Sequence, residues 1–217
     1  MCPTNLDLRA LRGVWLASAS IAAALSASCN PTPASGQFDA QRLELRGCDE
    51  ELLPWEPGFY TIDQFENRTT IRLQSIGGGI GQIDGIFIQV ENSLVDPTNP
   101  DGMPLGDPAL RAALIEQGVS VPPPIEGEPV GGAARAVLGF YESCPEARDV
   151  PEIIGRLRFT RFDPTNGGQI TGFVTAPVVV DTRTGDIVGE VLSGRFSFVV
   201  QKGRPYTNFT GPGNQAP

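Results

Sequence analysis

The feature that most constrains the fold is a period-two alternation of apolar and polar residues in short segments. The alternation covers residues 42–46, 70–74, 84–90 and 156–160. It predicts strands with one buried and one exposed face. The chain also has 26 glycines and 20 prolines among 217 residues, which favours many turns and long loops over long helices.

The C-terminal third carries the clearest strand pattern. Two segments rich in β-forming residues, 169–181 and 187–200, each follow a tight turn that contains Gly. Together with the preceding alternating segment, residues 154–200 predict a three-stranded antiparallel meander. Pro177 lies inside one of these strands, where its missing N–H predicts a bulge or an edge position.

One helix is marked by its end signals. Asp107 is a predicted N-cap, Pro108 suits the first helical position, and Gly118 suits the end. Leu110 and Leu114 lie one turn apart and are expected to face the core.

The segment 134–143 is ambiguous, because its alanines favour helix while its Val, Phe and Tyr residues favour strand. We choose strand, since the following Cys144-Pro145 would end it before a hairpin. The fold class predicted is therefore mainly β: an antiparallel sandwich or flattened barrel with one short helix in an insertion.

The first 28 residues have the plan of a secretory signal peptide. Arg9 and Arg12 precede an uncharged apolar-to-small run over residues 13–25, which is too short for a comfortable membrane span. Small residues and Cys29 follow. This order predicts export.

The stretch Leu25-Ser26-Ala27-Ser28-Cys29 resembles the lipobox of bacterial lipoproteins, although its leucine lies four residues before the cysteine instead of three. The resemblance implies that Cys29 carries lipid, which would attach the protein to a membrane. Asn30 follows where Asp would imply inner-membrane retention, so the resemblance favours the outer membrane. The alternatives are ordinary signal-peptide cleavage, giving a secreted or periplasmic soluble protein, and a retained membrane anchor.

The expected organisation is a signal peptide over residues 1–28 and a lipidated cysteine with a flexible tether over 29–37. A single β-rich domain is expected over 38–205, followed by a flexible tail over 206–217. The tether assignment depends on the Pro-rich and polar composition that follows Cys29.

Four cysteines are present. Cys2 would leave with the signal peptide, and Cys29 would be lipidated. Cys48 and Cys144 then form an even pair in an oxidising compartment, which predicts a disulfide. The alternative is two free, buried thiols.

After Cys29 the chain resembles the uncharacterised β-rich lipoproteins of myxobacteria and their relatives. The resemblance depends on the lipobox, the Cys144-Pro145 step and the final Gly-rich hairpin, and it implies no activity.

Composition excludes several chemistries. The chain has no histidine, which excludes Ser-His-Asp and Cys-His catalytic pairs. Its net charge is −9 and no compensating basic patch is visible, so we expect no nucleic-acid partner. A carboxylate-dependent hydrolase acting on envelope polysaccharide stays open, with Asp63, Glu66, Asp84 and Asp163 as candidates.

Oxygen-bearing side chains around a glycine turn suggest one metal site. Asp96, Asn99 and Asp101 could bind calcium, although the spacing is not that of an EF-hand. The alternative is a polar turn, and no other cofactor is expected. The function that these features favour is a lipid-anchored, non-enzymatic cell-envelope module that binds an envelope protein or glycan.

Overall fold

The structure is a computed structural model that describes residues 34–46, 48, 54–76, 84–144 and 151–201. The predicted signal peptide, Cys29 and the C-terminal tail lie outside these residues. The strands are β1 (Ser35–Asp39), β2 (Arg42–Leu43), β3 (Phe59–Phe65), β4 (Arg68–Gln74), β5 (Gly85–Glu91), β6 (Met103–Leu105), β7 (Ala134–Gly139), β8 (Pro151–Phe162), β9 (Gln169–Asp181) and β10 (Ile187–Val199). The helices are η1 (Asn92–Leu94), which is 3₁₀, and α1 (Pro108–Glu116).

All strand pairs are antiparallel and belong to one sheet, with the order β1-β10-β9-β8-β7-β5-β4-β3. β2 extends the sheet beside β10, and β6 pairs with β8. The sheet bends sharply where β7 meets β8, because Val137 and Glu152 are the one residue pair in register there.

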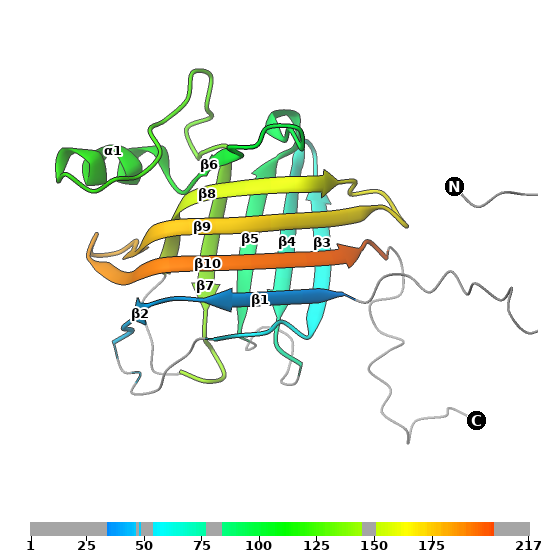
Figure 1. Ribbon diagram of the computed structural model, residues 1–217, viewed down its shortest axis with the longest axis horizontal. Helices are drawn as coiled ribbons and strands as arrows, with labels where there is room; N and C mark the ends of the chain where they lie inside the picture. The colour runs from blue at the N-terminus through cyan, green and yellow to red at the C-terminus, as the bar shows by residue number, and fades with distance from the viewer. Residues whose placement is uncertain (1–33, 47, 49–53, 77–83, 145–150, 202–217) are drawn as a thin grey trace, which may run out of the picture. The chain divides into compact units, whose positions relative to one another are not determined.

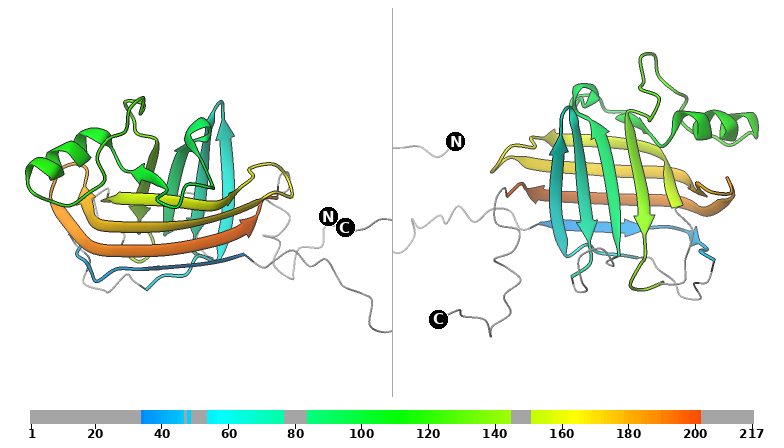
Figure 2. Two further views of the ribbon diagram at one scale, coloured as in Figure 1. Left: turned by 45° about the horizontal axis from the view of Figure 1, so that its top comes forward. Right: turned by 180° about the vertical axis from the view of Figure 1, so that it is seen from behind.

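The bend folds the sheet into two layers. In Figure 1, β8, β9, β10 and β1 cross in front of β3, β4, β5 and β7, and the right-hand view of Figure 2 shows this second layer from behind. The hydrophobic core lies between the layers. The fold is therefore mainly β, a curled antiparallel half-barrel with one helix in an insertion, and the predicted fold class is confirmed.

A seam joins the two ends of the sheet. Phe38 of β1 and Trp55, which precedes β3, exchange two backbone N–H to C=O hydrogen bonds of 2.9 Å. The Phe38 ring is fully buried, 5.9 Å from the Trp55 ring, and the indole N–H donates to Ser75 Oγ at 3.1 Å. Gly194 of β10 leaves room for this ring, because a Cβ there would collide with it. The β1 edge of the sheet is thus joined to the segment that leads into β3.

The Pro177 prediction is confirmed in its bulge form. Ile154 of β8 pairs with Val178 of β9, and the next pair is Arg156 with Thr175. The strand β9 therefore has one more residue than β8 between these two pairs. Pro177 therefore lies in a central strand without having to donate a ladder hydrogen bond. Across from it in β10, Val191 has a φ of 49° and is 49% exposed.

The helix also agrees with the sequence. The Asp107 side chain accepts hydrogen bonds from the backbone N–H groups of Ala109 at 2.8 Å and Leu110 at 3.3 Å. Leu114 is buried against Ile154, Val178 and Val180. Figure 1 shows α1 beside the turn that joins β9 and β10. Across the described part of the chain, no helix has the length and apolar character needed to cross a membrane.

Three expected boundaries need correction. The flexible tether was expected to extend to residue 37, but β1 begins at Ser35, because residues 35–39 pair with β10 along their whole length. The alternating segment 42–46 was expected to be a strand, and Arg42–Leu43 is the paired part. The segment 134–143 is a strand as chosen, but it ends at Gly139.

The predicted disulfide between Cys48 and Cys144 is confirmed, with Cα atoms 5.5 Å apart. Asp84 stabilises the turn that carries Cys144. Its carboxylate accepts hydrogen bonds from the N–H groups of Glu142 at 2.7 Å and Ser143 at 3.2 Å, and from Ser143 Oγ at 2.6 Å.

We expect the disulfide to be a major source of stability, because it joins residues separated by 96 positions. Replacing both Cys48 and Cys144 with alanine should lower the free energy of unfolding by about 4–5 kcal/mol through the larger entropy of the unfolded chain. Urea unfolding of the variant and the parent, each with and without reductant, measures this. Reductant should destabilise the parent and leave the variant unchanged; equal stability of the two oxidised proteins would contradict the prediction.

Candidate functional site

The layer formed by β8, β9, β10 and β1 has an outer face that points away from the core. One end of this face is covered by α1, and the other end is bare. At the covered end, residues 151–155 of β8 and 178–181 of β9 are buried on both faces, because α1 packs on the outside. Beyond the bulge, both strands alternate between buried and more exposed residues. The bare end therefore presents a sheet surface made by β8, β9, β10 and β1.

A row of long side chains crosses the middle of the bare end. Arg158 of β8, Phe173 of β9, Arg195 of β10 and Gln37 of β1 are successive cross-strand neighbours. The Arg158 guanidinium lies 5.0 Å from the Phe173 ring centroid, a cation–π contact. Arg195 Nη2 lies 3.5 Å from Gln37 Oε1.

The rows on either side add two more arginines and several hydroxyl groups. In strand order, one row is Arg156, Thr175, Ser193 and Asp39, and the other is Arg161, Thr171, Ser197 and Ser35. Thr171 and Ser197 hydroxyls lie 2.9 Å apart in a hydrogen bond. We call the three rows together the arginine face.

The electrostatics of the arginine face differ from those of the remaining described surface. Within the described residues, no carboxylate forms an ion pair with Arg156, Arg158, Arg161 or Arg195. The other described arginines all do so: Arg42, Arg46, Arg68, Arg72, Arg111, Arg135 and Arg183. Of the arginine face's own side chains, Asp39 is the acidic one and lies at its β1 edge.

This arrangement corrects the expectation that the chain has no basic patch. Three of the arginines come from β8 and one from β10, and apolar core residues alternate with them in the sequence. Sheet pairing brings them to one face. The sequence signal was the alternation itself: Arg156 and Arg158 occupy the polar positions of the segment predicted as a strand.

The loop over residues 117–133, which joins α1 to β7, borders the arginine face on the side of α1. A groove of about 550 Å³ lies between this loop and the sheet, and its lining includes Pro122, Pro123, Arg156, Pro177 and Val191. The groove therefore continues the arginine face into a more apolar border.

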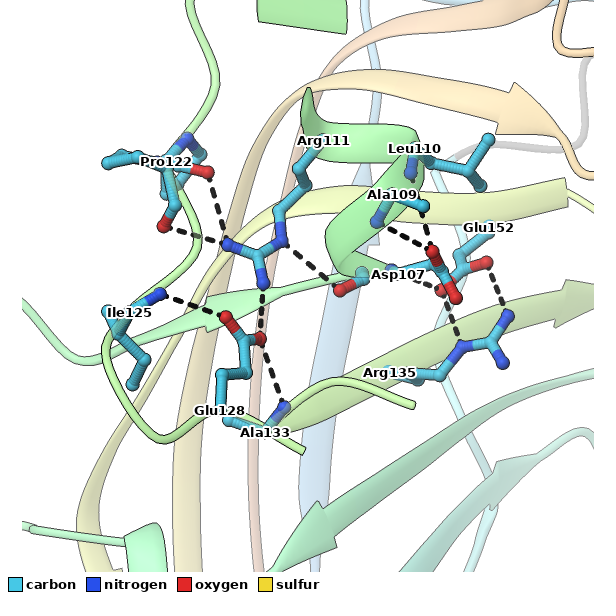
Figure 3. Close-up of polar contacts among 12 residues, drawn as sticks. Asp107, Ala109, Leu110, Arg111, Pro122, Ile125, Glu128, Ala133, Arg135 and Glu152 are labelled. Atoms are coloured by element: carbon cyan, nitrogen blue, oxygen red, sulfur yellow. Dashed lines mark hydrogen bonds and ion pairs between the residues drawn. The ribbon is translucent and has the colours of Figure 1, made fainter. Parts of the chain in front are cut away.

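A buried arginine on α1 holds the loop in place (Figure 3). Arg111 is fully buried, and it donates to the carbonyl oxygens of Gly106 at 3.2 Å, Pro122 at 3.2 Å and Pro123 at 2.8 Å. It also pairs with the Glu128 carboxylate. A guanidinium suits this role because it directs several N–H donors in fixed directions.

The partner of Arg111 has further contacts of its own. Glu128 accepts hydrogen bonds from the N–H groups of Ile125 at 3.0 Å and Ala133 at 3.1 Å. One ion pair thus fixes both ends of the turn that contains Glu128. Sequence analysis placed Leu110 and Leu114 on the buried side of α1 and missed Arg111, since a lone arginine on a helix is normally exposed.

A second buried carboxylate lies nearby (Figure 3). Glu152 of β8 is fully buried and accepts hydrogen bonds from Arg135 Nε at 2.8 Å and Nη2 at 2.6 Å. It also accepts one from the Asp107 N–H at 3.0 Å. The hydrogen bond to Glu152 raises the pKa of Arg135 above its ordinary value. The start of α1 is thereby joined to the bend between β7 and β8.

The residues proposed for calcium form a polar turn. Asp96 Oδ1 accepts hydrogen bonds from the Thr98 N–H at 2.8 Å and from Thr98 Oγ1 at 2.6 Å. Asn99 Oδ1 accepts from the Asp101 N–H at 3.0 Å. In the part of the chain that the structure describes, no group of three or more His, Cys, Asp or Glu residues is placed to hold a metal. Calcium binding by Asp96, Asn99 and Asp101 stays a prediction.

The four carboxylates considered for hydrolysis lie in separate local structures. Asp63 pairs with Arg72 at 2.6 Å. Glu66, with a φ of 53°, lies in the tight turn between β3 and β4, and Asp84 stabilises the Cys144 turn. Asp163 begins the turn between β8 and β9. None of the contacts described for these residues joins two of them into a catalytic pair.

Asp96 and Asp163 share one motif, Asp-Pro-Thr-Asn, and the structure gives it the same geometry twice. Asp163 Oδ1 accepts hydrogen bonds from the Thr165 N–H at 3.0 Å and Oγ1 at 2.6 Å. The threonine hydrogen bonds lower the pKa of both aspartates below the ordinary value. The repeat is visible in the sequence, and it forms the same Asp–Thr turn at both positions.

The comparisons with known proteins add no further assignment. No family model, curated protein or solved structure matches the chain.

Removing the buried guanidinium should strongly destabilise the protein. We expect Arg111→Met to lower the free energy of unfolding by about 3–5 kcal/mol, because Glu128 would stay buried without its partner. Chemical denaturation measures the loss. The double variant R111M/E128Q should recover part of it, since no buried charge is left alone. A loss of stability as small as that of an exposed arginine would contradict the inferred role.

The repeated turn predicts two matched carboxyl titrations. The pKa of each aspartate is lower in the folded state than in the unfolded state, so the ionised carboxylate stabilises the fold. This stabilisation is fully present at pH values above the unfolded pKa of about 3.9, and it is lost as the pH falls through the pKa of the folded state. Thr165→Val should raise the pKa of Asp163 and leave that of Asp96 unchanged, while Thr98→Val should do the reverse. Carboxyl-detected NMR titration measures both. An unchanged pKa at the neighbouring aspartate would show that the threonine is not the cause.

Proposed function

We propose that this protein is a lipid-anchored cell-envelope protein, attached through Cys29, that acts without catalysis as a binding module. The arginine face is its binding surface. The observation that carries the proposal is the set of four arginines that lie together on one bare sheet surface with no carboxylate partner among the described residues.

The local charge of the face outweighs the net charge of the chain at short range. The whole sequence carries a net charge of −9. At physiological salt, however, exposed charges are screened over about 8 Å, so an anionic group on the face is influenced mainly by the arginines near it. Guanidinium groups that lack a carboxylate partner in the protein can direct paired N–H donors to a carboxylate or phosphate oxygen of the ligand.

A non-enzymatic role is supported by the structural contacts that the candidate catalytic carboxylates make. Asp63 is paired with Arg72, and Asp84 and Asp163 accept hydrogen bonds that stabilise turns. The hydrolase alternative would need two carboxylates facing one reaction site. No specific observation favours that arrangement, so we do not propose it.

The setting of the proposal comes from the N-terminal sequence. The export signal over residues 1–28 and the lipobox-like stretch ending at Cys29 support attachment to a membrane, and Asn30 supports the outer membrane. Since β1 begins at Ser35, five residues separate Cys29 from the first strand. The tether is therefore short, and it would keep the module near the bilayer surface.

Two variants test attachment and binding in one fractionation experiment. In a lysate washed at high salt, which weakens charge-based binding, Cys29→Ser should move the protein from the membrane fraction to the soluble fraction, because the lipid attachment site is gone. The purified Cys29→Ser protein should still bind washed envelope fragments, and adding R158Q/R195Q should reduce the bound fraction severalfold. Immunoblotting of pellet and supernatant measures both effects.

The matched control is R68Q/R72Q, which removes the same charge from β4 on the other layer. Both arginines are exposed and ion-paired, so their loss should change stability little. Equal retention of all three soluble proteins on envelope fragments would refute the binding role. Membrane retention of the variant that combines Cys29→Ser with R158Q/R195Q would refute lipid attachment, because this variant lacks both the lipid site and the binding arginines. Release of the cleaved, unmutated protein into the soluble fraction would support the secreted alternative.

A further inference from the structure

We propose that the arginine face binds an acidic polysaccharide, a sugar chain that carries carboxylates at intervals. This inference deepens the proposed function and takes its cell-envelope setting from it. It depends on the spacing of the arginines, on the neutral hydrogen-bonding groups between them and on the shape of the surface.

The arginines form an open grid instead of converging on one point. Arg158 and Arg195 lie two strands apart with Phe173 between them, which corresponds to about 10 Å. Arg156 and Arg158 lie two residues apart along β8, about 7 Å. A single small anion could contact few of these groups at once. A polymer with repeated negative charges can contact several of them.

The spaces between the arginines contain neutral donors and acceptors. Hydroxyl and amide groups of Gln37, Thr171, Thr175, Ser193 and Ser197 are exposed or half-exposed there. Such groups can exchange hydrogen bonds with sugar hydroxyls, whereas an acidic peptide or a phospholipid headgroup offers few hydroxyls to match them.

The surface over Phe173 is shallow and suits a flat ligand. A depression of about 340 Å³ lies there, lined by residues that include Gln37, Asp39, Thr175, Ser193 and Arg195. The Phe173 ring is half-buried, and the Arg158 guanidinium carbon lies 5.0 Å from its centroid. It can contact the C–H face of a sugar ring. It does not resemble the apolar side chains that insert into a bilayer from the exposed side of a membrane-binding surface.

The edge of the grid has one acidic group, Asp39, next to Ser193. Its carboxylate would repel a ligand carboxylate but can accept a hydrogen bond from a sugar hydroxyl. A bound chain is therefore expected to place its carboxylates toward β8 and β10 and its hydroxyls toward β1.

The test uses the purified full-length protein in uncharged detergent, with polygalacturonate as the acidic polysaccharide and dextran as the neutral one. Calorimetric titration should show binding of polygalacturonate, weakened by added salt, and no binding of dextran. R158Q/R195Q should weaken binding at least about tenfold, because two charge-assisted contacts are lost. R68Q/R72Q should stay within about twofold of the parent, since it alters net charge equally but lies on the other layer. Thermal unfolding of each variant confirms that the fold is intact.

Two comparison ligands decide the class of partner. Polyglutamate and phosphatidylglycerol vesicles carry anionic groups without sugar hydroxyls, and both should bind more weakly than polygalacturonate. Tighter binding of either one, with the same loss in R158Q/R195Q, would overturn the sugar proposal in favour of an acidic protein or a membrane surface. Equal losses in both arginine pairs would also overturn it, because the attraction would then be unspecific.

The outcomes separate this inference from the proposed function. If envelope retention depends on Arg158 and Arg195 but polygalacturonate does not bind, the binding module stands and the polysaccharide inference is wrong. If polygalacturonate binds at the arginine face but envelope retention does not depend on Arg158 and Arg195, the polysaccharide inference stands and the proposed cellular role is wrong.

Discussion

The structure depends on how the three long strands β8, β9 and β10 cover their two faces. Their inner face is buried against β3, β4, β5 and β7, and this contact forms the main core. In the described part of the chain, α1 covers one end of their outer face, where it packs on Ile154, Val178 and Val180. The bulge at Pro177 marks where this cover ends. One strand set therefore supplies both the hydrophobic core and a broad surface that no described element covers, and the arginines lie on that surface.

The border of this surface is held by a costly interaction. Burying Arg111 and Glu128 removes two charges from water, and the pair is tolerable because each side chain also satisfies backbone groups of the loop. A hydrophobic pair of the same volume could not bind the carbonyl oxygens of Pro122 and Pro123. The ion pair thus specifies the position of a loop that has little secondary structure of its own. Its position sets the shape of the groove beside Arg156.

Much of the fold could be predicted because its signals are local. Period-two alternation identified β4, β5, β8, β9 and β10, and the capping residues around Asp107 identified α1. The disulfide was predicted because Cys48 and Cys144 are the two cysteines left after Cys2 and Cys29 are assigned to the signal peptide and the lipid. The strands β1, β3 and β6 were missed, because β1 is a short segment with a single fully buried side chain, Phe38, β3 has none, and β6 has three residues. The Asp-Pro-Thr-Asn motif that contains Asp96 and Asn99 recurs at Asp163, and both copies form the same hydrogen-bonded turn.

By itself the sequence determined the class of fold, the cysteine pair, the helix and the absence of histidine chemistry, since each depends on neighbouring residues or on composition. Tertiary structure alone decided the candidate site. Arg158 and Arg195 are separated by an entire strand in the chain, and net charge concealed them because it sums over all surfaces. They become neighbours of Phe173 through strand register, which sets which side chains share a face. The alternation within one strand indicates which of its residues share a face, but the bulges that shift β8 against β9 decide which residues of the two strands become neighbours.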